Sequence, residues 1–199
     1  MKSSFKGIYK WPELRQIESA NPLNIVDGRK KEMRAMSTGK NVQYQETPNP
    51  QALKFYWGET ISSASLECTS YETSGQSPLA QKIFGFPWAQ SVFIGTDFVT
   101  IEKQDWVSWD VLAKPLAHLI EEHLTKGEPV VLQDTNSNSE ENSSELVTKI
   151  KWVLEHEIRP ALAVDGGDVQ FVSYNQGYLK ISMMGACSGC PSSQITLKE

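Results

Sequence analysis

The segment from residue 164 to residue 191 constrains the fold of this chain more than any other part of its 199 residues. Polar and apolar side chains alternate from Tyr178 to Met183, which is the period-two pattern of a strand with one buried face. Val169 and Phe171 belong to a similar alternation on the other side of a turn signal at residues 175–177. The two segments therefore predict an antiparallel β-hairpin.

A pair of cysteines follows this hairpin on a short loop of small residues. Cys187 and Cys190 are flanked by Gly185 and Gly189, and Pro191 comes directly after them. Glycine permits backbone conformations that a Cβ atom forbids, so such a loop can bring both sulfurs to one side. Thiols at this spacing can close a disulfide or supply half of a four-thiolate metal site. The spacing alone leaves both alternatives open.

The rest of the chain does not supply the other half of a four-ligand site. The one further cysteine is Cys68, which lies in a polar stretch and is predicted to be half-buried. The histidines fall in predicted helices, and no two of them have ligand spacing: His118, His123 and His156. A four-cysteine site therefore requires two copies of the chain, each giving Cys187 and Cys190.

The region 42–127 predicts a small α+β domain ahead of the hairpin. Its signals are a strand at 53–57, a helix that begins at Ser77-Pro78 and ends near 84, and a hairpin formed by 91–94 and 98–103. An apolar stripe then predicts a helix that ends at Gly127, and Pro115 predicts that this helix starts near Lys114 or is kinked.

The other segments complete the predicted organisation into two small domains. Residues 1–41 show no clear periodicity and are predicted to be a disordered extension or a mis-annotated start. Residues 128–143 are predicted to be a flexible linker, because its part from 134 to 143 has no apolar residue to bury. Residues 144–199 predict an α-β-β-α domain whose first helix runs to about 162 and whose last helix is cut short, because only eight residues follow Pro191.

Composition and charge exclude several function classes. The net charge of −5 and the scattered lysines and arginines argue against a nucleic-acid partner. No apolar run approaches the roughly 20 residues that span a bilayer, so no membrane partner is expected. Three cysteines, two of them at metal spacing, favour a reducing compartment. We expect bacterial cytoplasm, or the mitochondrial matrix if the source is eukaryotic.

Several motifs together resemble the Nfu family of NifU-type proteins. In the C-terminal part these are VDGGDVQFV, GYLKI and MGACSGCPSS, and in the N-terminal part TPNPQALKF and IFGFPWAQSVFIGTDFVTI. The resemblance implies a non-enzymatic iron–sulfur cluster scaffold or carrier. It implies that Cys187 and Cys190 bind a 4Fe-4S or 2Fe-2S cluster between two protomers, receive it from upstream assembly factors and deliver it to apoproteins.

The main alternative is a thiol–disulfide oxidoreductase that uses the same cysteine pair. That chemistry places the pair at a helix N-terminus within a βαβ unit, whereas here a hairpin precedes it. Zinc in the same dimeric four-thiolate geometry is also chemically allowed. Asp165 and Asp168 flank the Gly-Gly turn before the hairpin, where we expect them to cap backbone amides.

Overall fold

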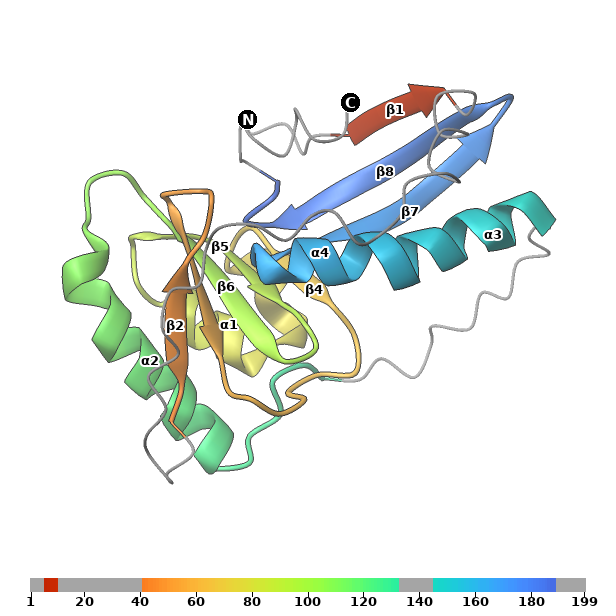
Figure 1. Ribbon diagram of the computed structural model, residues 1–199. Helices are drawn as coiled ribbons and strands as arrows, with labels where there is room; N and C mark the ends of the chain where they lie inside the picture. The colour runs from red at the N-terminus through yellow and green to blue at the C-terminus, as the bar shows by residue number, and fades with distance from the viewer. Residues whose placement is uncertain (1–5, 11–40, 133–144, 189–199) are drawn as a thin grey trace, which may run out of the picture.

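The computed structural model describes residues 6–10, 41–132 and 145–188. These residues form two sheets with their helices, as Figure 1 shows. The predicted α+β class is confirmed, with an antiparallel five-stranded sheet in the N-terminal domain and a helix with a β-hairpin in the C-terminal domain.

The N-terminal sheet has the strand order β2-β3-β6-β5-β4, and every neighbouring pair is antiparallel. Its strands are β2 (Gln43–Glu46), β3 (Ala52–Tyr56), β4 (Leu66–Cys68), β5 (Ala89–Ile94) and β6 (Phe98–Lys103). A 3-10 helix, η2 (Glu72–Gln76), leads into α1 (Pro78–Phe84), and α2 (Trp109–Thr125) follows the sheet.

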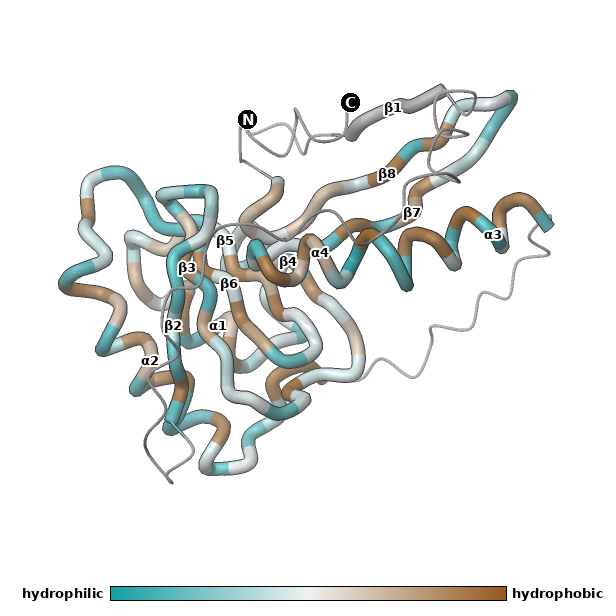
Figure 2. Tube along the Cα trace, in the orientation of Figure 1, coloured by the Kyte–Doolittle hydropathy of each residue, from teal (hydrophilic) through white to brown (hydrophobic). Residues whose placement is uncertain are grey.

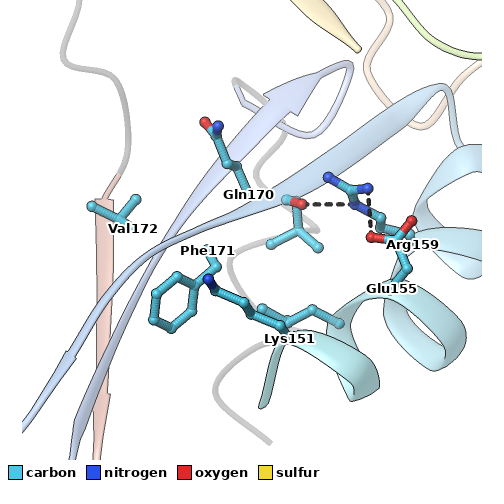
Figure 3. A pocket seen from close by; sticks show the side chains of 8 residues that line it. Lys151, Glu155, Arg159, Gln170, Phe171 and Val172 are labelled. Atoms are coloured by element: carbon cyan, nitrogen blue, oxygen red, sulfur yellow. Dashed lines mark hydrogen bonds and ion pairs between the residues drawn. The ribbon is translucent and has the colours of Figure 1, made fainter. Parts of the chain in front are cut away.

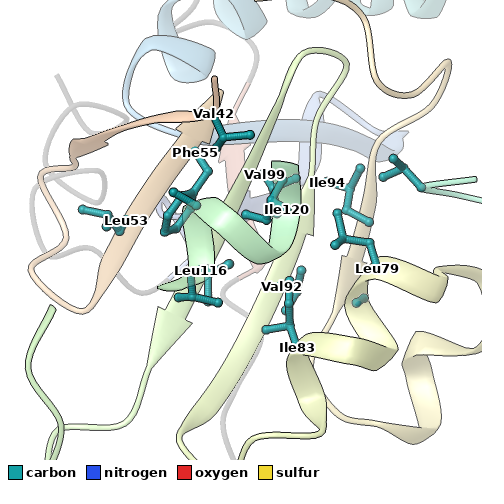
Figure 4. Packing of buried hydrophobic residues seen from close by; sticks show 14 of the residues in the cluster. Val42, Leu53, Phe55, Leu79, Ile83, Val92, Ile94, Val99, Leu116 and Ile120 are labelled. Carbon is teal, nitrogen blue, oxygen red and sulfur yellow. The ribbon is translucent and has the colours of Figure 1, made fainter. Parts of the chain in front are cut away.

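Alternation along the strands sends one set of side chains toward α1 and α2. Val92 and Ile94 of β5 and Val99 and Ile101 of β6 pack there with residues of both helices (Figure 4). Because successive residues of a strand face opposite sides, Phe93 and Thr100 lie on the other face of the sheet. The helices therefore cover only one face, and the second face needs a different cover.

Helix α1 starts where the sequence predicts, because the Ser77 hydroxyl accepts a hydrogen bond from the Ala80 amide at 3.0 Å. For α2, the alternative of a start near Lys114 is wrong, since that helix begins at Trp109 and contains Pro115. The alternative of a kink at Pro115 stays a prediction. Ser108 caps its start, and the buried stripe that includes Leu116 and Ile120 extends through the proline. Pro115 removes one backbone hydrogen bond from the helix, and burial of the apolar stripe offsets that cost.

The C-terminal domain begins with a helical segment that the sequence predicts as one continuous helix. It consists of α3 (Glu145–Val153), a π-helical stretch, η3 (Leu154–Ile158), and α4 (Arg159–Val164). Pro160 has no N–H to donate to the preceding turn, and the wider π turn lies directly before it. Along the segment apolar and polar residues alternate at helical spacing, as the colouring of Figure 2 shows.

The predicted hairpin is present as β7 (Gly167–Asn175) and β8 (Tyr178–Gly185). Gln176 and Gly177 connect the strands with φ angles of 49° and 85°, as a type I′ turn requires. The other edge of β8 pairs with β1 (Lys6–Lys10), so the sheet order is β1-β8-β7. The sequence pattern does not predict a strand within residues 1–41.

The remaining predictions about chain organisation concern segments at the edges of the described parts. Val130 is buried in the N-terminal core, and the Leu132 amide donates to the Gln76 carbonyl at 2.7 Å. The first residues of the predicted linker 128–143 therefore pack against the domain. The predicted last helix after Pro191 lies outside the described residues. Within the described chain, no helix has the length and apolar character needed to cross a membrane.

Candidate functional site

Strand β8 ends in a tight turn that carries Cys187. The Ser188 amide donates to the Gly185 carbonyl at 3.0 Å, and the Ser188 hydroxyl donates to the same oxygen at 2.9 Å. Gly185 has a φ of +63°, and a Cβ atom there would lie 2.6 Å from the Gly166 carbonyl oxygen. Only glycine fits both conditions, as the sequence predicted for this position. We call residues 185–188 the cysteine loop.

The Gly166-Gly167 turn faces this loop and leaves room for the cysteine. The Ala186 amide donates to the Gly166 carbonyl at 3.1 Å. A Cβ atom at Gly167 would overlap the Cys187 sulfur and lie 2.9 Å from the Cys187 Cβ. The sequence pattern predicts a turn at the two glycines and does not reveal this second role. The signal was available, because the antiparallel register pairs the start of β7 with the end of β8.

The Cys187 side chain points into its own domain. It is 7% exposed and belongs to the cluster formed by Ile150, Val169, Leu179, Ile181 and Met183. Cys190, the second predicted ligand, lies outside the described residues. The structure thus places one of the two predicted site residues, in an inward position that leaves little of its sulfur accessible.

An ion pair ties the helical segment to the start of β7. The Asp168 carboxylate accepts from the Val169 amide at 2.7 Å and lies 3.0 Å from Arg159 Nε. This confirms the prediction that Asp168 caps a backbone amide. Arg159 also contacts Glu155 at 2.7 Å and donates to the Val169 carbonyl at 3.2 Å, as the dashed lines in Figure 3 show.

A groove of about 370 Å³ lies between this helical segment and β7 (Figure 3). Its lining combines the paired Arg159 and Glu155 with Lys151, whose ammonium lies 5.3 Å from the centre of the Phe171 ring. Among the described residues that line the groove, none carries a sulfur atom. Its charged side chains make contacts within the domain, so it gives no support to a second site.

Cys68 is excluded as a partner for the predicted pair. It is fully buried in the N-terminal core, whereas Cys187 belongs to the C-terminal core, so the prediction of a half-buried thiol was wrong. Burial, with a smaller contribution from Glu67, raises the pKa of the Cys68 thiol to about 11. In the described parts of the chain, no group of three or more His, Cys, Asp or Glu side chains could hold a metal ion.

The N-terminal domain, whose sequence motifs predict no chemistry, contacts the cysteine loop. The Thr100 hydroxyl donates to the Gly166 carbonyl at 2.7 Å, and Glu67 accepts from the Gly185 amide at 3.0 Å. The Asn49 amide group donates to the Ala186 carbonyl at 3.4 Å. Nothing in the local sequence around these residues signals the contacts, because they join residues more than 60 positions apart.

Family models match both parts of the chain in the same order as the two sheets. The model described as scaffold protein Nfu/NifU N terminal matches residues 42–127, and the NifU-like domain matches residues 150–199. The chain belongs to the Nfu/NifU-like family. This confirms the resemblance drawn from the motifs, and it assigns the chain to a family of scaffold proteins rather than enzymes.

Named relatives agree with the assignment. "NifU-like protein 4, mitochondrial" of Arabidopsis thaliana is 36% identical over 94% of this chain and 67% of its own length. "NFU1 iron-sulfur cluster scaffold homolog, mitochondrial" of Drosophila sechellia is 37% identical over 79% of this chain and 58% of its own length. A solved NifU-like protein from Saccharomyces cerevisiae is 28% identical, covering 54% of this chain and all of that one, with a TM-score of 0.43. This chain spans about three fifths to two thirds of the curated relatives' length.

Proposed function

We propose that this protein is an iron–sulfur cluster scaffold or carrier that holds a cluster between two copies of the chain and delivers it to apoproteins. The observation that carries the proposal is the position of Cys187 on a loop beyond β8, three residues before Cys190, in a chain that belongs to the Nfu/NifU-like family. The name of the Drosophila relative describes an iron–sulfur cluster scaffold, which supports the same role here.

Cys187 and Cys190 are the proposed ligands of this cargo. Thiolates are the usual protein ligands of iron–sulfur clusters, and a 4Fe-4S cluster takes four of them. Because each chain offers two cysteines at this spacing, the ligand set closes only when a second copy supplies the same pair. The donor count therefore favours a cluster shared by two protomers, and it fits either the 4Fe-4S or the 2Fe-2S type.

The small residues around the pair suit a cluster that has to leave again. Ala186, Ser188 and Gly189 place no bulky side chain beside the sulfurs. Thiolates exchange on a metal when an incoming thiolate can approach it, so client cysteines would replace those of the carrier one at a time. The inward position of Cys187 means that the loop has to turn outward before the sulfur can bind iron.

The proposed partners follow from the same role. They are upstream assembly factors that supply the cluster and apoproteins that receive it. The named relatives are mitochondrial proteins, so the mitochondrial matrix is the compartment that we propose.

Substitution of the paired cysteines tests the proposal. After anaerobic reconstitution with iron and sulfide, we expect Cys187→Ser and Cys190→Ser to lose at least nine tenths of the visible cluster absorption, because each removes a ligand from both copies. Cys68→Ala is the matched control, since Cys68 lies in the other core, and it should keep the wild-type absorption. Iron and sulfide per chain separate a four-iron from a two-iron cluster. Equal cluster content in wild type and Cys187→Ser would overturn the proposal.

A further inference from the structure

We propose that the N-terminal domain is a reversible cover that holds the cysteine loop in its inward position, with Thr100 and Glu67 as positioning residues. Cluster binding then requires the two domains to separate. This inference rests on the proposed function for its biological meaning, but the structural claim concerns only the loop and its cover.

The cover is the face of the N-terminal sheet that α1 and α2 leave open. Strand alternation brings to this face a set of mixed polar and aromatic side chains: Lys54, Tyr56, Glu67, Phe93, Phe98 and Thr100. We call this set the docking face. Phe93, Phe98 and Thr100 are at most 3% exposed, although no helix of their own domain covers them. The C-terminal domain buries them, and β8 contacts both β5 and β6.

Hydrogen bonds from the docking face end on the backbone that surrounds Cys187. The Gly166 carbonyl accepts from Thr100 on one side and from the Ala186 amide on the other. The Glu67 carboxylate accepts a hydrogen bond from the Gly185 amide, and the Asn49 side-chain amide donates one to the Ala186 carbonyl. The two residues before Cys187 are therefore fixed by side chains of a different domain.

An aromatic contact supports the same part of the loop. The Phe93 ring lies against Gly185, where a Cβ atom would come within 2.8 Å of the ring. Phe93, Phe98 and Met184 form a small apolar cluster that joins the two domains. In Figure 1 the end of β8 accordingly meets the N-terminal sheet at β5.

Polar contacts at the rim hold the end of α4. Lys54 Nζ donates to the Ala163 carbonyl at 2.7 Å, and Gln45 donates to the Val164 carbonyl at 3.2 Å. Such donors satisfy carbonyls that the last turn of a helix leaves without partners. On the opposite rim, Ser65 donates to Asp168 at 2.9 Å.

Two features of the interface between the domains, a hollow and partly buried charged groups, favour its opening. A hollow of about 670 Å³ remains inside it, lined among others by Ser65, Glu67, Arg159 and Met184. Burial raises the pKa of the Glu67 carboxyl and lowers the pKa of the Lys54 ammonium, so both groups regain favourable hydration when the domains part. Polar interfaces between domains of one chain are typical of domains that move relative to each other.

The docked arrangement is incompatible with a cluster shared by two chains. In it the Cys187 side chain packs in the core of its own domain and is 7% exposed. Two copies have to bring their sulfurs to a single cluster, which requires the loop to turn outward on each copy. The contacts of Thr100 and Glu67 fix the backbone around Cys187, so their loss allows the cysteine loop to turn outward.

The rate of Cys187 alkylation in the full-length, metal-free chain tests this inference. Iodoacetamide labelling is followed by mass spectrometry in a Cys190→Ser background, so that the peptide contains a single thiol. We expect Thr100→Val and Glu67→Leu each to accelerate labelling about fivefold, the shift in an opening equilibrium that follows the loss of one hydrogen bond. Thr100→Ser and Glu67→Gln keep the donor and the acceptor, and they should stay within about twofold of the background rate.

Cys68 in the same samples reports on unfolding, because it is fully buried in the N-terminal core. We expect it to remain unlabelled while Cys187 reacts. The inference is overturned if Thr100→Val and Glu67→Leu leave the Cys187 rate unchanged, or if Cys187 and Cys68 accelerate together. The labelling experiment contains no iron, so its result does not depend on whether the chain binds a cluster. If labelling contradicts the proposed cover, the cysteine substitutions still test the proposed cluster binding.

Discussion

At the residue scale, the site depends on how closely glycine and cysteine fit together. The space that a side chain at Gly167 would occupy holds the Cys187 side chain, and the Met184 carbonyl would lie 2.9 Å from the added Cβ. Neither neighbour can withdraw without moving the end of β8. The second glycine of the Gly-Gly turn is therefore required by packing, whereas Gly166, with a φ of +79°, is required by its backbone conformation.

We expect Gly167→Ala to lower the free energy of unfolding of the C-terminal domain by about 1–3 kcal/mol, the usual cost of overpacking a filled site. Pulsed hydrogen exchange of the β7 and β8 amides across a urea series measures it for that domain alone. Gly75→Ala is the control, since nothing lies within 4 Å of the added Cβ there. Equal unfolding midpoints for the two variants would show that the close contact between Gly167 and Cys187 does not affect the free energy of unfolding.

At the scale of elements, the end of α2 is held by a buried histidine. His123 Nδ1 lies 3.1 Å from Lys82 Nζ of α1, and His123 Nε2 lies 3.2 Å from the Pro129 carbonyl. A neutral ring satisfies both, because Nδ1 then accepts from Lys82 while Nε2–H donates to Pro129. Glu128 lies 3.2 Å from Nδ1 and pairs with Lys82, which completes the link between the two helices.

This arrangement predicts an acid sensitivity of the N-terminal domain. Burial, followed by the charge of Lys82, lowers the pKa of His123 below its ordinary value of 6.5. Between the folded and the unfolded pKa, His123 is therefore protonated in the unfolded chain and neutral in the folded chain. The free energy of unfolding should be fully retained above pH 6.5 and fall as the pH drops below it toward the folded pKa. Urea midpoints at about pH 7.5 and about pH 5.5 measure the effect. In His123→Gln the difference between the urea midpoints at the two pH values should be smaller than in the wild type. An equal difference in both proteins would show that other groups cause the acid sensitivity.

At the scale of the whole molecule, each domain completes the packing of the other. The N-terminal sheet has helices on one face and the C-terminal domain on the other, and the cysteine loop lies where the two meet. The same contacts that finish the packing therefore keep the proposed ligand away from a second copy. Together, the proposed shared cluster and the proposed cover couple the assembly of two chains to the separation of the two domains.

We expect cluster binding to convert a monomer of 22.3 kDa into a dimer, because the four thiolates come from two chains. Light scattering of anaerobic samples before and after reconstitution measures the mass. Cys187→Ser should remain at the monomer mass under both conditions. A cluster-bearing species of monomer mass, in the absence of added thiol, would contradict the shared site.

Features that depend on neighbours along the chain could be predicted from the sequence. The period-two pattern and the Gln176-Gly177 turn specify the β7–β8 hairpin, and Ser77-Pro78 specifies the start of α1. The motifs around Cys187 are also local, so the family could be recognised from them. The assignment of Cys187 and Cys190 as ligands remains a prediction, since the second of them lies outside the described residues.

Features that depend on residues distant in the chain follow from packing and could not be predicted from the sequence. Burial of its apolar stripe carries α2 across Pro115, and the closed core of the first domain makes Cys68 inaccessible. The contact of Thr100 with Gly166 follows from the sheet face that its own helices leave open. Such contacts leave no local pattern, because their partners are brought together by packing rather than by spacing along the chain.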